Sequence, residues 1–399
     1  MTSAGKSAIA RGGRSCILVT DGETRAALAT VRALGRAGHE VHVVAAAARS
    51  LAGASRFSSS EHAIGDPASD PRQWSEGLER VAREVGANLL FPISEVALGT
   101  LYAYPIDSSW PVVCPQREAY EAATDKHALL ERAASLGIAV PRTLLFEDPG
   151  ALVTLPDPFR YPVVVKARRS RFLVDGRWRS GGVEIVRSAG ELATARAAPG
   201  LRGGLLLQEF VAGHGEGVFL LASQGRTLVR FAHRRLREKP PTGGVSVLSE
   251  SIEPDPELLR QSEELLADLD WTGVAMVEFR RAPDGRPVLM EINPRPWGSL
   301  HLAVHAGVDF PSLMVALFRG EAIPAVAARV GIRMRWLLGD IDHLYISLRR
   351  SDVRKITGKS VPALLRDFLL SFVDGSKSDV LDVNDWRPFW RELASWIRG

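Results

Sequence analysis

Short apolar runs alternate with amphipathic segments along the first third of this 399-residue chain. An apolar run at 15–20 is followed by an Ala- and Leu-rich helical segment and by a second apolar run at 41–44. Further helix and strand patterns follow at 74–92 and 111–113. Buried strands that alternate with helices predict a parallel sheet covered by helices, so residues 15–118 are expected to form a small α/β domain.

Beyond this domain the pattern changes to isolated helices and pairs of strands. The predicted elements are a helix at 122–136, strands at 161–167 and 205–211, a hairpin of 218–222 with 227–231, and helices at 255–269 and 311–318. The strands of a hairpin are antiparallel, in contrast to the parallel strands expected in residues 15–118.

One stretch, 274–295, reads V-A-M-V-E-F-R-R-A-P-D-G-R-P-V-L-M-E-I-N-P-R. Asp-Gly between two apolar runs is a strong hairpin signal, and a turn centred within 284–285 sets Glu278 directly opposite Glu291. Because side chains alternate along a strand, both carboxylates and the amide of Asn293 project from the same face. Three oxygen donors are therefore expected to converge.

Carboxylates that face each other across a hairpin repel unless a cation lies between them. Oxygen ligands without Cys or His suit a hard ion, and so few protein ligands suit Mg²⁺, which keeps waters and takes phosphate oxygens; Mn²⁺ is a substitute. The alternative is a solvated hairpin face, on which Glu and Arg are common. The hairpin alone favours neither interpretation.

Composition narrows the classes of function. Apolar residues make up 46% of the chain, enough for extensive cores, and the net charge of +4 gives little support to nucleic-acid binding. Neither Cys16 nor Cys114 lies in a metal or redox spacing, and the first strand is not followed by a G-x-G-x-x-G fingerprint. Residues 1–14 are expected to be a flexible N-terminus, and without an apolar leader or span the expected location is cytoplasmic, with no membrane partner.

Two lysines lie where a cation is unfavourable. Lys126 falls in the first turn of the predicted helix, where it opposes the helix dipole, and Lys166 lies within a buried strand. The Arg- and Gly-rich segment 168–182 follows and suits a flap that closes over phosphate. Solvated surface residues are the alternative for Lys126 and for the flap.

A second basic stretch could clamp an acidic substrate with guanidinium groups and loop amides. Its candidate substrate-binding residues are Arg235, Arg237, Gly243, Gly244 and Ser246. In the last helical segment an apolar stripe is expected to dock on the protein's own core. The stripe consists of Trp386, Phe389, Trp390, Leu393 and Ile397.

Six motifs occur in order: D-K-H-A-L-L, P-V-V-V-K-A, L-Q-E-F-V, G-E-G-V, E-F-R and M-E-I-N-P-R. Together they are specific, and over about residues 15–320 the chain resembles the ATP-grasp superfamily, in particular the carbamoyl-phosphate-synthase-like carboxylate ligases. The resemblance implies a pre-ATP-grasp domain at 15–118 followed by two α+β subdomains, a central one with the flap at 119–204 and a C-terminal one with the Mg²⁺ site at 205–324. Residues 325–399 match no family pattern and are expected to form a helical extension.

The same resemblance implies a role for each motif residue. Lys126 and Lys166 would hold the ATP phosphates. Glu209 and Val211 would meet the adenine edge, and Glu216 would bond the ribose hydroxyls. The metal would lie on Glu278, Glu291 and Asn293, and the catalytic residues would be Arg295, which steadies the transferred phosphoryl group, and Lys166.

The implied reaction is ATP-dependent activation of a carboxylate as an acyl phosphate, which an amine then attacks to give an amide, ADP and phosphate. Such phosphoryl transfer depends on positioning and charge neutralisation and needs no nucleophilic side chain. Two alternatives remain open: a carboxylase or carbamate-forming enzyme that phosphorylates bicarbonate, and a non-catalytic nucleotide-binding module. The expected partners are small-molecule acids and amines and, because homodimers are the commonest soluble assemblies, a second copy of the chain.

Overall fold

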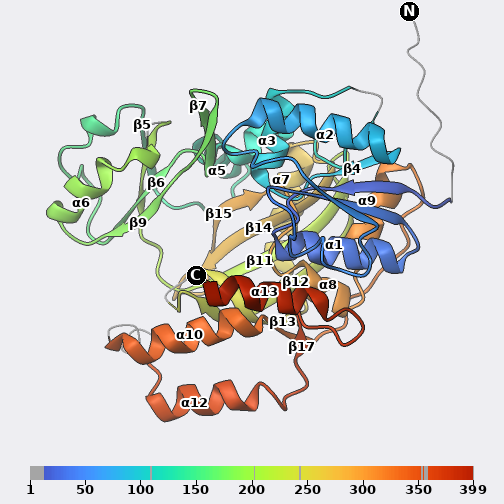
Figure 1. Ribbon diagram of the computed structural model, residues 1–399. Coiled ribbons are helices and arrows are strands. Elements are labelled where there is room, and N and C mark those ends of the chain that lie inside the picture. The colour runs from blue at the N-terminus through green and yellow to red at the C-terminus, as the bar shows by residue number, and fades with distance from the viewer. Residues whose placement is uncertain are drawn as a thin grey trace, which may run out of the picture.

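The computed structural model describes residues 13–107, 110–201, 203–241, 244–351, 354 and 358–398. Four sheets lie in it, with strand orders β3-β2-β1-β4, β5-β10-β6-β9, β15-β14-β11-β12-β13-β16-β17 and β7-β8. Figure 1 shows the N-terminal domain above the largest sheet and the β5-β10-β6-β9 sheet to one side. The expected mixture of α/β and α+β parts is confirmed.

The N-terminal domain is a parallel sheet with helices on both faces. Leu18, Val44 and Leu90 pack under α2 and α3, whereas Ile17 and Val43 face α1. The short polar strand β3 was not predicted, because S-E-H-A carries no apolar pattern. The elements are β1 (Cys16–Val19), α1 (Arg25–Arg36), β2 (Glu40–Ala45), β3 (Ser60–Ala63), α2 (Pro71–Val85), β4 (Leu89–Phe91) and α3 (Glu95–Ala103).

The single helix expected at 122–136 is two helices, α4 (Arg117–Thr124) and α5 (Lys126–Ser135). Asp125 lies between them with φ −82° and ψ 97°, which is not helical. Its side chain accepts a hydrogen bond from the backbone N–H of Ala128, so it caps α5. The cap ends one helix, starts the next and leaves Lys126 as the first residue of α5.

The central subdomain is an antiparallel sheet from which the flap projects as a β-hairpin. Its elements are β5 (Thr143–Phe146), β6 (Val163–Ala167), the flap strands β7 (Arg171–Val174) and β8 (Arg177–Ser180), β9 (Val183–Val186), α6 (Ala189–Arg196) and β10 (Leu205–Glu209). β10 pairs with β5 and β6. The predicted subdomain boundary between residues 204 and 205 is therefore wrong, because the connection to the next sheet follows Glu209.

The large sheet carries α7 and α5 on one face and, on the other, α8 and α9, against which α1 of the N-terminal domain packs. Val218, Val277 and Ile292 belong to the core on the α7 side, and Phe219 and Met276 to the core shared with the N-terminal domain. The elements are β11 (His214–Ser223), β12 (Arg226–Lys239), β13 (Val245–Ile252), α7 (Pro256–Asp268), β14 (Gly273–Arg281), β15 (Pro287–Asn293), α8 (Leu300–His305) and α9 (Phe310–Phe318).

The hairpin of β14 and β15 has the predicted pairing of Glu278 with Glu291, but its turn differs. Ala282 and Arg286 bond across a three-residue loop in which Gly285 has φ 85°, so the turn is centred on residue 284. A register shift between residues 278 and 279 then moves the pairing by one. The bulge compensates for the turn and keeps the two carboxylates opposite.

The C-terminal region is more than a helical extension. β16 (Arg333–Arg335) pairs with β13, and β17 (Lys377–Ser378) pairs with β16, so the region completes the large sheet. The boundary at 325 therefore divides a continuous sheet. The helices of the region are α10 (Leu337–Arg349), α12 (Val361–Leu370) and α13 (Arg387–Arg398).

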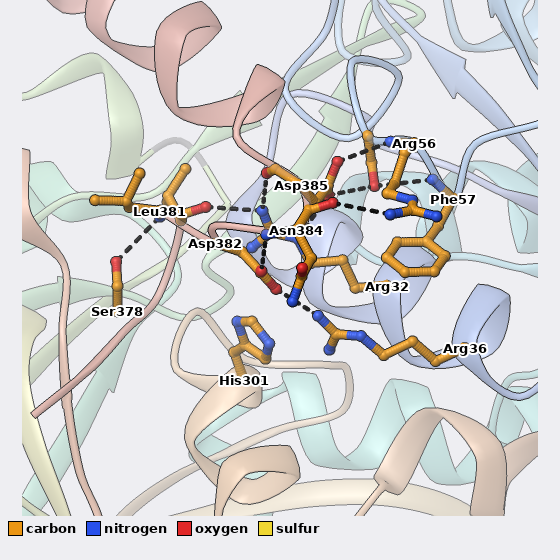
Figure 2. Close-up of polar contacts among 12 residues, drawn as sticks. Arg32, Arg36, Arg56, Phe57, His301, Ser378, Leu381, Asp382, Asn384 and Asp385 are labelled. Atoms are coloured by element: carbon orange, nitrogen blue, oxygen red, sulfur yellow. Dashed lines mark hydrogen bonds and ion pairs between the residues drawn. The ribbon is translucent and has the colours of Figure 1, made fainter.

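The segment before α13 is fastened to α1 of the N-terminal domain (Figure 2). The guanidinium of Arg32 donates to the Asp385 carboxylate at 2.9 Å, and both side chains are fully buried. It also donates to the carbonyl oxygens of Asp379, Val380 and Asp385. One turn further along α1, Arg36 pairs with Asp382 near the surface.

The apolar stripe of α13 does not dock as predicted. Trp390 and Ile397 are 55% and 70% exposed, and Phe389 alone of the stripe packs against the core. Glu392, on the inner side, accepts a hydrogen bond from the indole N–H of Trp336 at 2.7 Å. This polar contact helps to fix the rotation of the helix, which leaves most of the stripe in solvent. Within the described residues, no helix combines the length and apolar character needed to cross a bilayer.

Candidate active site

The opposed carboxylates of β14 and β15 lie at the centre of the site. Each is held by a cation: Arg235 lies 3.2 Å from Glu278, and the Lys126 ammonium lies 3.1 Å from Glu291. The side-chain amide of Asn293 donates to Glu291 at 3.4 Å. The structure thus brings the three predicted metal ligands onto one face, with positive charge beside them.

The pKa values of the two carboxyl groups are shifted in opposite directions, although burial raises both. For Glu278, burial raises the pKa, because Arg235 offsets only part of the desolvation. For Glu291, burial also disfavours the charge, but the ammonium groups of Lys126 and Lys166 lower the pKa below its usual range. Glu291 therefore stays ionised, as a metal ligand must.

The two predicted phosphate-binding lysines face the same carboxylate from different elements. Lys126 begins α5 and donates to Glu291 and to the hydroxyl of Ser170 at the base of the flap. Lys166, on β6, is 5% exposed and has no hydrogen bond or ion pair with any described residue. Burial, and then the charge of Lys126, lower its pKa to about 8. Glu291 attracts this ammonium group without forming an ion pair with it, so the place suits a further anion.

Next to Lys166 the sheet presents an apolar face that no described element covers. Lys166 pairs with Val183 and Val164 pairs with Ile185, so all four side chains lie on one face. Val183 is 64% and Ile185 is 39% exposed. A flat apolar surface beside an unpaired cation suits a nucleotide base and its phosphates. These two residues were not predicted from the sequence, because the four-residue strand β9 that carries them is short and directly follows the flap.

The predicted nucleotide contacts on the hinge lie at the junction of the two subdomains. Glu209 ends β10, and its carboxylate accepts a hydrogen bond from the backbone N–H of Arg142. Val211 follows in the half-buried connection between β10 and β11. Glu216, on β11, is bound by the guanidinium of Arg281, and although burial opposes ionisation these contacts lower its pKa. A ribose would share this carboxylate with Arg281.

The substrate-binding candidates divide into two groups. Arg235 lies in the site, where it contacts Glu278 and the carbonyl oxygen of Gly244 at 3.4 Å. Ser246 lies on β13 opposite Glu238, beside this group. Gly243 lies outside the described residues.

The prediction that Arg237 contacts the substrate is wrong. The register of β12 against β13 skips Leu236, so a bulge turns Arg237 to the face opposite Arg235. There it pairs with the fully buried Asp340 of α10 at 2.8 Å and donates to Ser371. Arg237 therefore fastens the C-terminal helices and does not face the site.

Arg295, the predicted catalytic arginine, lies beside the ligand set. Its guanidinium donates to the side-chain oxygen of Asn293 at 3.3 Å and to the carbonyl of Pro296. It also acts electrostatically on Glu95, the first residue of α3, whose pKa burial raises. Glu95 is 9% exposed and its carboxylate has no bonded partner among the described residues.

Sequence analysis missed Glu95, although a signal for it existed. It follows β4, and the carboxyl ends of parallel strands are the usual ligand-binding edge of an α/β sheet. Through Glu95 the N-terminal domain contributes a charge to the site formed by the two later subdomains.

Comparisons with known proteins agree with this geometry. A family described as "ATP-grasp in the biosynthetic pathway with Ter operon" matches residues 203–339. A D-alanine–D-alanine ligase from Anaeromyxobacter sp. (strain Fw109-5) is 28% identical over 42% of this chain and 56% of its own length. The matched region thus spans little more than half of that relative.

Solved structures resemble the fold at lower identity. A biotin carboxylase from Campylobacter jejuni superposes with a TM-score of 0.63 at 16% identity, covering 80% of this chain and 74% of its own. An L-amino acid ligase from Bacillus licheniformis gives a TM-score of 0.58 at 17% identity, covering 77% and 75%. The match to an ATP-grasp family over residues 203–339 thus accompanies a two-subdomain fold with lysines and carboxylates at its centre, and in these respects the chain is similar to ATP-grasp proteins.

Proposed function

We propose that this protein is an ATP-dependent ligase that activates a carboxylate as an acyl phosphate and joins it to an amine, releasing ADP and phosphate. The observation that carries the proposal is the pairing of Glu278 with Glu291 within reach of two buried lysines. A structural role for this arrangement would not explain why Lys166 is buried without an ion pair.

The residues present fit Mg²⁺ and ATP. The carboxylates of Glu278 and Glu291 and the amide oxygen of Asn293 are hard oxygen donors, and their present partners are cations. Lys166 lacks an ion pair, and the exposed Val183 and Ile185 offer an apolar face. Bound Mg²⁺, or Mn²⁺ in its place, would neutralise the negative charge of the phosphates.

The side chains of the chain would then act mainly by positioning and by charge. Lys126 and Lys166 hold the phosphates, and Arg295 steadies the transferred phosphoryl group beside Asn293. Glu209 and Val211 meet the adenine edge at the hinge, and Glu216 bonds the ribose.

The groups around the carboxylate pair select the acid and the amine. Arg235, Gly244 and Ser246 lie together at the end of β12 and β13, where a guanidinium and loop amides can bind an acidic group. Glu95 faces the same space from the N-terminal domain. The substrates are accordingly a small carboxylic acid and a small amine.

ADP release in the presence of Mg²⁺ tests the proposal. Purified protein is assayed with ATP against a panel of amino acids and other carboxylic acids, each with and without an amine or bicarbonate. Dependence on both an acid and an amine supports the ligase. Stimulation by bicarbonate alone would instead identify a bicarbonate-phosphorylating enzyme, and ATP binding without turnover under every condition would identify a nucleotide-binding module.

A further inference from the structure

The flap hairpin of β7 and β8 rests on the N-terminal domain instead of projecting into solvent (Figure 1). The indole N–H of Trp178, on β8, donates to the hydroxyl of Thr100 in α3 at 2.9 Å. The backbone N–H of Trp178 donates to the carbonyl of Ala68 at 3.0 Å. The distal half of the flap is therefore joined to a different domain by two hydrogen bonds from one residue.

Gly99 creates the space that the Trp178 ring occupies. A Cβ atom at Gly99 would lie 2.5 Å from Cη2 and 2.7 Å from Cζ2 of the indole, closer than packed atoms approach, and 3.1 Å from the Tyr120 hydroxyl. Glycine within a helix such as α3 costs about 1 kcal/mol relative to alanine. The helix thus carries an unfavourable residue at the one point where the flap tryptophan meets it.

The proximal end of the flap is fixed at the phosphate site. Ser170 accepts a hydrogen bond from the Lys126 ammonium at 2.5 Å, and the carbonyl of Arg168 accepts one from the Lys126 backbone at 3.0 Å. Arg169 donates to the hydroxyl of Thr124 at 2.7 Å. The hairpin consequently spans from the lysine that pairs with Glu291 to the helix that begins with Glu95.

We propose that Trp178 is a positioning residue that latches the flap onto α3 at Gly99 and thereby keeps water away from the reacting groups. The water-excluding role rests on the proposed ligase activity, whereas the contact between Trp178 and α3 does not depend on it. An acyl phosphate is lost to hydrolysis if water reaches it, so a closed flap makes ATP use depend on the amine. The latch also gives the N-terminal domain a direct part in closure.

Limited proteolysis tests the latch without any reaction. Trypsin cleaves after Arg177 and Arg179, which flank Trp178 on β8, and such cleavage requires the strand to detach. We expect Trp178→Ala and Gly99→Ala to raise the rate of cleavage at these two bonds at least tenfold, measured by mass spectrometry on the full chain without nucleotide. Trp386→Ala, which removes an exposed tryptophan elsewhere, is the matched control and should leave the rate unchanged.

Gly99→Ala separates a latch from a general loss of stability. Alanine favours the helix, so α3 should not be weakened by propensity, while the added methyl group displaces the indole. If neither variant raises cleavage at Arg177 and Arg179, the latch is refuted. Trp178→Phe, which keeps a ring but removes the N–H donor, should lie between the wild type and Trp178→Ala.

The chemical consequence is read from the ratio of amide formed to ADP released with the acid and amine found by the panel assay. We expect this ratio to fall at least fivefold in Trp178→Ala, with a higher KM for ATP and a smaller change in kcat for ADP release. An unchanged ratio despite faster proteolysis would overturn the water-excluding role. If the wild type itself releases no ADP with any acid, the ligase proposal fails while the proteolysis result still decides the latch.

Discussion

Lys166 offers a test in which stability and function move in opposite directions. Its buried ammonium has a pKa lowered from 10.5 to about 8, chiefly by burial and then by Lys126. A change of this size corresponds to a cost on the order of 3 kcal/mol in the folded protein at neutral pH. Methionine has a similar shape and no charge. We therefore expect Lys166→Met to raise the free energy of unfolding of the nucleotide-free protein by about 1–3 kcal/mol and to abolish ATP binding.

The gain should depend on pH in a defined direction. Between about pH 8 and 10.5 the unfolded chain binds the proton that folded Lys166 has released, so wild-type stability rises with pH in this window. The advantage of Lys166→Met is thus complete below pH 8 and shrinks toward pH 10.5.

The matched control is the other buried lysine of the site. Lys126 is paired with Glu291 and Ser170, so Lys126→Met leaves a carboxylate that is 30% exposed without its closest cation and should cost about 1–3 kcal/mol. Urea unfolding at pH 7 without nucleotide measures both effects, and calorimetric titration with ATP and Mg²⁺ measures binding. Equal destabilisation by the two substitutions would refute the view that Lys166 lacks an ion pair.

Two further predictions concern the attachment of the C-terminal region. Arg32→Ala should lower the free energy of unfolding by about 3–5 kcal/mol, because it leaves the buried Asp385 carboxylate without its partner. Arg36→Ala breaks the more exposed pair with Asp382 and should cost at most about 1 kcal/mol. Equal losses for the two variants in urea unfolding would contradict the burial argument. Burial raises the pKa of Glu392 to about 7, so wild-type stability should fall as pH rises from 4.5 to 7. Glu392→Gln should remove this fall when the free energy of unfolding is measured across the same pH range. An identical dependence of stability on pH in the variant would contradict the prediction.

The sequence was sufficient to predict the pairing of the two carboxylates, because the contacts that determine it are local. Asp-Gly between apolar runs indicated the hairpin, and the pairing of Glu278 with Glu291 followed from it. The pairing held although the turn lies at residue 284, because a bulge next to Phe279 restored the register. The predicted pairing therefore agrees with the structure only because the bulge compensates for the shifted turn, and the sequence does not reveal the bulge.

The errors arose where distant parts of the chain decide the structure. A bulge at Leu236, where β12 bends along β13, sends Arg237 away from Arg235, and alternation alone would have kept them together. β16 is a three-residue strand that forms by adding to the edge of an existing sheet. Its own residues carry no strand pattern strong enough to predict.

The prediction that the C-terminal stripe docks on the core failed for a related reason. Its period correctly indicated an amphipathic helix, but the face that turns inward is chosen by tertiary contacts such as the bond from Trp336 to Glu392. Glu95 was missed because its environment comes from α5 and β15 and not from its own neighbours in sequence. Local chemistry was predictable, whereas the orientation of elements against one another was not.

The central claim is that Glu278 and Glu291 face each other because they hold Mg²⁺ and ATP. The most direct test is the rate of Mg²⁺-dependent ADP release by Glu291→Ala, compared with the wild type under the acid and amine found by the panel assay. Removal of one of the two opposed ligands should lower this rate at least a thousandfold while the protein remains folded. A rate equal to that of the wild type would contradict the metal assignment and the proposed function with it.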